Sequence, residues 1–116
     1  MARLTEKIIM AGSVTPISAI PTAHRFMSAV TEGALCSVSG EAVRGVIIET
    51  AVANEMVSVA EIGHVLVETG AAIVAGASVQ TDATGRAIPL AAGAKAGLAL
   101  SSAGAAGQLI QIRVPS

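Results

Sequence analysis

The stretch Val65–Val114, VLVETGAAIVAGASVQTDATGRAIPLAAGAKAGLALSSAGAAGQLIQIRV, decides the fold of this 116-residue chain. It alternates short Val, Ile and Leu runs with turns centred on glycine, and it contains no cluster of reactive side chains. An Ala-rich helix is the competing interpretation of its last part. Each glycine there would cost a helix about 1 kcal/mol relative to alanine. These glycines are Gly93, Gly97, Gly104 and Gly107. The stretch therefore predicts strands joined by turns.

The first half of the chain continues this pattern with more proline. Proline lacks an amide hydrogen and is poorly tolerated in central strands. The segment that holds Pro16 and Pro21 should therefore be a loop, followed by an edge strand around His24–Val30. A helix over residues 43–60 is the alternative farther on, but the β-branched residues of that segment favour strands. Further short strands are expected at Ala34–Val38, Gly45–Ile48 and Met56–Val59.

The two halves of the chain align as a weak internal repeat of residues 15–62 with residues 65–116. Asn54 and Gly107 occupy matching places, and both residue types tolerate the left-handed conformation of a tight turn. A chance alignment of Ala-, Gly- and Val-rich sequence is the alternative. A true repeat predicts two strand-rich halves packed with approximate two-fold symmetry. The other matched positions are Ile20 with Ile73, Phe26 with Val79, 33–36 with 85–88, 45–48 with 97–100, and 55–59 with 108–112.

A chain of this length is expected to be one domain with one core. Residues 1–14 should form an N-terminal arm or an edge strand, and residues 15–116 a single β domain. The hydrophobic fraction is 53%, yet Phe26 is the single aromatic residue, so the core must be built from small aliphatic side chains. The predicted fold class is all-β, as a small barrel or sandwich of short strands.

Charged residues are scarce, at 13% of the chain against about 25% in ordinary soluble domains. Low charge is typical of surfaces that partners cover, and a bland Ala-rich domain is the alternative. The net charge is −1 and the seven basic residues are scattered, which argues against nucleic-acid binding. Glu6 and Lys7 interrupt the first apolar segment, and no long Gly-free apolar run follows. We therefore expect neither a signal peptide nor a membrane span.

The reactive residue types do not converge on a site. His24 and His64 have no Cys or carboxylate at ligand spacing beside them, and Cys36 lies in a run expected to be a half-buried strand. The Gly-rich residues 93–97 lack the Gly-Lys-Ser/Thr helix start of a phosphate loop. Four glutamates are expected at solvated strand ends and turns, namely Glu49, Glu55, Glu61 and Glu68. We expect no enzyme activity, no cofactor and no metal site.

A pattern of turns and small residues runs through the second half of the chain. Its elements are Gly70-Ala71-Ala72-Ile73, Ala75-Gly76, Asp82-Ala83-Thr84-Gly85-Arg86-Ala87, Gly97-Leu98-Ala99-Leu100, and Ala106-Gly107 before a final strand through Ile112. On these elements the chain resembles the phage capsid cement, or head decoration, proteins. The resemblance covers nearly the whole chain and is strongest from Gly70 to Val114. The chain departs from the family pattern at Ala23–Phe26 and at Asn54, where an Ala-Gly turn is more typical.

This resemblance implies a small β protein that binds the outer surface of an icosahedral phage head and stabilises contacts between major capsid protein subunits. The partners it implies are the major capsid protein and the chain itself, with a homo-trimer favoured and a dimer possible. The protein would be made in the host bacterial cytoplasm and located on the capsid exterior of the virion, without nucleic acid or membrane. Besides exposed strand edges, the expected interface residues are Ile8, Ile9, Met10, His24, Arg25 and Phe26. The alternative function is a small β-barrel binding module for a ligand or peptide, which predicts a monomer with a concave site.

Overall fold

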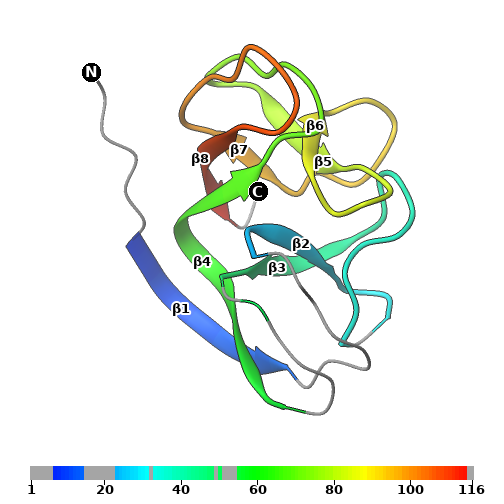
Figure 1. Cartoon of the computed structure of the whole chain (residues 1–116), viewed down its shortest axis with the longest axis vertical. Helices are drawn as coiled ribbons and strands as arrows, with labels where there is room; N and C mark the ends of the chain where they lie inside the picture. Colours follow the sequence, from blue (N-terminus) through cyan, green and yellow to red (C-terminus); the bar gives the residue numbers. More distant parts are fainter. Residues whose placement is uncertain (1–6, 15–22, 32, 49, 51–54, 115–116) are drawn as a thin grey trace.

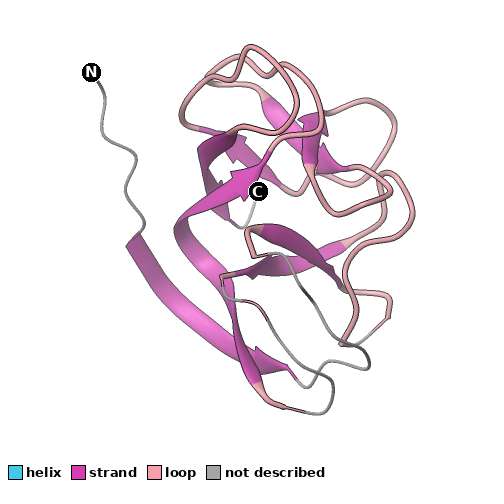
Figure 2. Cartoon of the chain, viewed as in Figure 1, coloured by secondary structure: helices cyan, strands magenta, loops and turns pink. Residues whose placement is uncertain are grey.

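The chain folds into eight β-strands, with no helix in the residues that the structure describes (Figures 1 and 2). This structure, a computed structural model, describes residues 7–14, 23–31, 33–48, 50 and 55–114. The all-β prediction is confirmed. The strands are β1 (Lys7–Val14), β2 (Arg25–Ser28), β3 (Val43–Ile47), β4 (Val57–Glu68), β5 (Ser78–Thr81), β6 (Ala87–Pro89), β7 (Gly97–Ala99) and β8 (Leu109–Val114).

The strands form one antiparallel sheet in the order β2-β3-β4-β8-β7-β5-β6, and β1 pairs with β4 outside this path. The strand at each end of this path is hydrogen-bonded to a segment outside its own place in the strand order. At one end, Thr69 follows β4 and bridges Ala87 in β6, where the amide of Gly70 also donates to the Ala87 carbonyl at 2.8 Å. At the other end, the amide of Phe26 in β2 donates to the Gly85 carbonyl at 2.7 Å. The sheet therefore curls into a nearly closed barrel, visible in the upper part of Figure 1.

The strand order is symmetric about the central β4–β8 pair. On one side β4 is followed by β3 and β2, and on the other side β8 is followed by β7 and β5. The alignment of the two half-sequences matches these same strands, since it places Phe26 of β2 on Val79 of β5. Gly107 has a φ of 83° in the turn before β8, as its predicted role requires. Its counterpart Asn54 lies outside the described residues.

The core is built from small aliphatic side chains around one aromatic ring. Phe26 is fully buried, and its cluster draws residues from every strand of the barrel path. A second cluster, on the other face of β2, β3 and β4, contains Met27, Ile47, Val57 and Val59. Consecutive strand residues point to opposite faces, so Phe26 and Met27 serve different clusters. This part of the sheet is therefore apolar on both faces.

The long strand β4 belongs to the barrel and also pairs with β1, the strand outside the barrel path. β1 pairs with its part Val57–His64, and β8 pairs with its part Gly63–Glu68. β3 approaches β4 closely at Gly45, where an added Cβ would collide with the carbonyl oxygen of Ala60. Gly63 has a φ of 130° inside the strand, which any other residue would adopt only with strain. The chain thus continues through Gly63 as a strand.

The strand expected at Ala34–Val38 is absent, and this prediction is wrong. Leu35 makes one isolated bridge to Met27, and turns and bends surround it. The amides of Ser37 and Val38 donate instead to Oε1 of Glu41, at 2.7 and 3.3 Å. A carboxylate that takes two consecutive amides removes them from a strand ladder. The segment therefore covers the edge of β2 as a loop.

Candidate protein-binding surface

Three of the predicted interface residues lie at the start of β2. His24 has a φ of 61°, which non-glycine residues rarely adopt. Two backbone hydrogen bonds hold this conformation: its amide donates to the Ile47 carbonyl at 2.7 Å, and its carbonyl accepts the Glu68 amide at 2.8 Å. Arg25 is half-buried, while Phe26 is fully buried in the core. The Phe26 side chain therefore packs beneath this surface and has no exposed area for a partner to contact.

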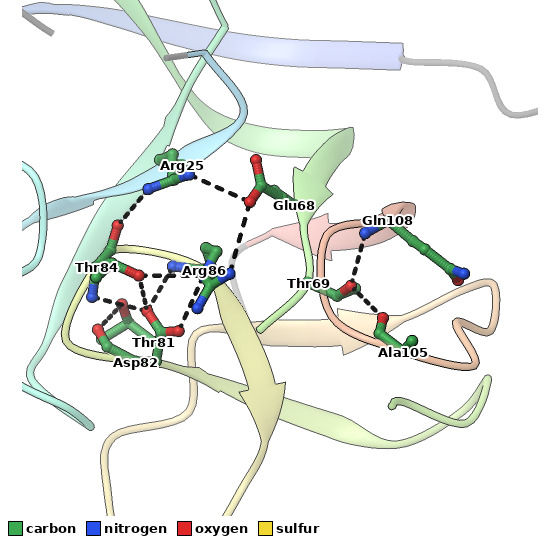
Figure 3. A network of polar contacts seen from close by, with 9 residues as sticks. All are labelled: Arg25, Glu68, Thr69, Thr81, Asp82, Thr84, Arg86, Ala105 and Gln108. Carbon is green, nitrogen blue, oxygen red and sulfur yellow. Dashed lines mark hydrogen bonds and ion pairs between the residues drawn. The ribbon is translucent and has the colours of Figure 1, made fainter. Parts of the chain in front are cut away.

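Arg25 connects β2 to β4 and to the β5–β6 turn (Figure 3). Its Nη2 donates to Oε2 of Glu68 at 3.2 Å, and its Nη1 donates to the Thr84 carbonyl at 3.1 Å. Nη1 of Arg86 lies 3.9 Å from the same Glu68 oxygen. Partly exposed ion pairs contribute only about 0–1 kcal/mol each. The main consequence of this network is geometric, because it fixes the β5–β6 turn against the end of β4.

Asp82 organises the β5–β6 turn from within. Its Oδ1 accepts the amides of Thr84 and Arg86, at 2.8 and 2.9 Å, and its Oδ2 accepts Nε of Arg86 at 3.3 Å. Burial alone would raise the pKa of this carboxyl, but the two amides, the Thr84 hydroxyl and the Arg86 charge outweigh burial, so the pKa is lowered. Gly85 completes the turn with a φ of 84°. A turn therefore forms over residues 82–85, and these hydrogen bonds hold its backbone.

The solvated glutamates expected from the sequence are only partly found. Glu61 and Glu68 lie in β4 with half-buried carboxylates, each held by arginine; Nε of Arg44 is 3.1 Å from Oε1 of Glu61. The expectation is wrong for Glu61 because β4 continues through Gly63 instead of turning. It is wrong for Glu68, the last residue of β4, because Arg25 and Arg86 bind its carboxylate. Glu55 is exposed, as expected, and Glu49 lies outside the described residues.

The described residues contain few features of a catalytic, metal or ligand site. Cys36 is 2% exposed, and burial, the largest influence, raises the pKa of its thiol to about 12, so it is neutral and poorly nucleophilic at neutral pH. No three metal-ligating side chains gather in the described part of the chain. Nor does that part contain a helix long and apolar enough to cross a membrane. A cavity of about 50 Å³ lies beside the Arg44–Glu61 pair, far below the ~300–1,000 Å³ of small-molecule sites.

Two segments whose loops meet at the top of Figure 1 contain no charged residue. Residues 69–81 and 96–112 contain no Asp, Glu, Lys or Arg. The two segments pack against each other, since Ile73 and Ala103 exchange backbone hydrogen bonds of 2.9 Å in both directions. Apolar side chains are exposed on them at Val74 (73%), Leu109 (42%) and Leu100 (36%). We call these two segments the uncharged end; desolvating this surface against a protein partner would bury no charge.

The other three predicted interface residues, Ile8, Ile9 and Met10, lie in β1. The register pairs Ile8 with Gly63 and Met10 with Ile62, with irregularities in the ladder on both sides of Met10. Their partners lie in the middle of β4, whereas His24 bonds to Glu68 at its end. The structure thus places the six predicted residues in two separate groups along β4.

Comparison with known proteins agrees with this architecture. The barrel is similar to the head fiber gp8.5 N base in bacteriophage phi29, a crystal structure that matches with a TM-score of 0.70 over 91% of this chain and 93% of that chain. Sequence identity is 17%, so this likeness shows a shared fold alone. The sequence profile of the phage cement proteins matches residues 16–115. The chain therefore belongs to the phage cement protein family, which indicates a structural role in the phage capsid. No curated protein sequence matches it significantly.

Proposed function

We propose that this chain binds the outer surface of an icosahedral phage head and stabilises contacts between major capsid protein subunits. The observation that carries this proposal is the cement-family match over residues 16–115. On this proposal the protein is made in the bacterial cytoplasm, assembles as a homo-trimer or a dimer, and ends on the capsid exterior.

The physical character of the barrel supports this role. A nearly closed barrel with fixed turns keeps its shape, and its uncharged end can be desolvated without burying ions. Binding only to the expanded shell stabilises that shell by mass action, by about 2.7 kcal/mol per site at a hundredfold excess over Kd. Repeated over many sites, such gains resist the internal pressure of packaged DNA.

We propose two contact regions for the partners of the chain. One is the uncharged end, with Val74, Leu100 and Leu109 exposed. The other consists of the two groups along β4, namely Ile8, Ile9 and Met10 in β1, and His24 and Arg25 at the start of β2. The backbone of β1 supports this choice, because an edge strand offers amides and carbonyls for pairing.

The competing function, a ligand-binding module, draws little support from the geometry. The cavity beside Arg44 and Glu61 has a volume of about 50 Å³, enough for a few water molecules. A catalytic function has no convergent reactive groups in the described residues to support it. We therefore favour adhesion over ligand binding or chemistry.

Co-sedimentation with purified heads tests the proposal directly. Undecorated expanded heads, mixed with the protein at micromolar concentration, should carry it into the pellet in a fixed ratio to the capsid subunit, and should then survive heating better than bare heads. Unexpanded proheads are the matched control. Absence of saturable binding to expanded heads would refute the proposed function.

A further inference from the structure

The strand β1 is an addition to the barrel. In the part of the chain that the structure describes, β1 pairs with β4 and with no other strand. The barrel path closes on itself at Thr69 and Ala87 without any contribution from β1. The cement-family match also begins at residue 16, after β1 ends. Figure 1 shows β1 lying along the outer side of β4, away from the other strands. Withdrawal of β1 would leave the barrel path intact and the Val57–His64 edge of β4 unpaired.

This edge is fitted to the sequence of β1. Gly12 lies opposite Val59, and a Cβ at Gly12 would stand 2.6 Å from Oε2 of Glu61. The Glu61 carboxylate also accepts Nε of Arg44 at 3.1 Å. A residue larger than glycine at position 12 would therefore have to displace this carboxylate from its place beside Arg44. Glycine fits the observed register without that change, and every copy of the chain carries both the edge and the strand.

The connection to the barrel is long enough for β1 to pair with another copy. Ten residue steps separate Val14, the end of β1, from His24, which backbone hydrogen bonds fix to β3 and β4. Ten extended residues span up to about 33–36 Å. The molecule measures 37 × 29 × 21 Å, so this span is comparable with its longest dimension and exceeds the other two. The segment also contains Pro16 and Pro21, which cannot donate amide hydrogens to a strand ladder.

We propose that copies of this chain exchange β1, each placing it on the β4 edge of the next copy, to form a closed cyclic homo-oligomer. Exchange preserves the register and hydrogen bonds of the unexchanged strand, so the choice between the two is set by the effective concentration of neighbouring copies. Assembly at high concentration, or side by side on a shell, favours exchange. The inference rests on the homo-oligomer of the proposed function and names the contact that holds it together.

Cysteine pairing between two differently tagged chains tests this exchange. Ser13 and Ser58 are directly opposite in the β1–β4 register, and antiparallel partners lie about 4.5–5.5 Å apart between Cα atoms, within disulfide range. In a Cys36→Ala background, one chain carries Ser13→Cys and the other, longer chain carries Ser58→Cys. After mixing, concentration and oxidation, exchange predicts a disulfide-linked heterodimer of the two lengths. A chain with Ala83→Cys, in the exposed β5–β6 turn, replaces the Ser58→Cys chain as the control and should give less than a tenth of that product.

Displacing β1 from β4 by a substitution tests the exchange independently of disulfide formation. Gly12→Val should displace β1 from β4 and convert the oligomer to a monomer in light scattering, with the β-sheet circular dichroism spectrum retained. A Gly12→Val protein that stays oligomeric, a wild type that is monomeric at all concentrations, or a double Ser13→Cys/Ser58→Cys chain that closes only within itself overturns the exchange. Wild-type binding to expanded heads is measured separately, so failure of the proposed function and failure of strand exchange give different results.

Discussion

Thr69 is a buried polar residue of the uncharged end, and Thr69→Val tests its contribution to stability. The side chain is fully buried where β4 ends and the barrel closes. Its Oγ1 donates to the Ala105 carbonyl at 2.9 Å and accepts the Gln108 amide at 3.1 Å (Figure 3). Valine has nearly the same shape but can make neither bond. The loop over residues 100–108 would then lose its side-chain attachment to β4.

The expected loss follows from these two bonds. A hydrogen bond contributes about 0.5–1.5 kcal/mol net, and unpaired buried partners cost more. Ala105 and Gln108 are exposed residues, so water can partly hydrate the carbonyl and the amide that lose their partner. We therefore expect the free energy of unfolding to fall by about 2 kcal/mol. The backbone bonds between Thr69 and residues 107–108 remain, at 2.7–2.8 Å, so the fold is kept.

Urea unfolding at one fixed protein concentration measures this change. With an m-value of about 2 kcal/mol/M, the midpoint should fall by about 1 M, and the melting temperature by about 8 °C. The control is Thr31→Val, at an exposed turn position, which should stay within about 0.5 kcal/mol of the wild type. A Thr69→Val protein as stable as this control would refute the role assigned to the buried hydroxyl.

Three further changes test other parts of the fold. Cys36 should resist iodoacetamide at about pH 8 when folded and react fully in urea, because its folded pKa is about 12; equal rates would contradict its burial. Asp82 has a lowered folded pKa, so its stabilisation is present above its ordinary pKa and lost as pH falls through the folded value. Asp82→Asn should therefore flatten the fall in melting temperature between about pH 5 and pH 2, and an unchanged slope would count against the turn network. Gly45→Ala should cost about 1–3 kcal/mol through its clash with β4, whereas Gly104→Ala, with open space around it, should be nearly neutral; equal melting temperatures would exclude the close approach.

Local signals in the sequence predicted the turns well. Gly85 and Gly107 both have positive φ in turns where their places between apolar runs predict them. Glycine carries this information because its conformational freedom acts within one or two residues, independently of what packs elsewhere. The all-β class was predicted from the same glycine-centred turns between apolar runs, and from the free-energy cost that four glycines would impose on a helix.

The errors come from contacts between residues far apart or from a competing side chain. Glu68 is bonded to Arg25, 43 residues away, and Glu61 to Arg44, 17 residues away. No local pattern marks such pairs, so these glutamates resembled solvated ones. The missing strand at Ala34–Val38 has the opposite cause, since Glu41 competes locally for the amides of that segment. The burial of Thr69 could not be predicted either, because the sequence around a threonine after a strand does not reveal whether a distant loop covers it.

The closure of the barrel limits how copies of this chain can join through their backbones. A closed sheet has no free edge, and here β6 is covered by Thr69 and Gly70, while β2 is covered by Leu35 and Gly85. In the described residues the remaining strand edges are the outer side of β1 and, when β1 leaves, the β4 edge beneath it. Association through strand pairing must therefore use β1 or replace it. Contacts elsewhere, as at the uncharged end, can use only side chains and loop backbone. Loss of oligomers on displacement of β1, with head binding retained by the uncharged end, would separate these two modes of contact within one chain.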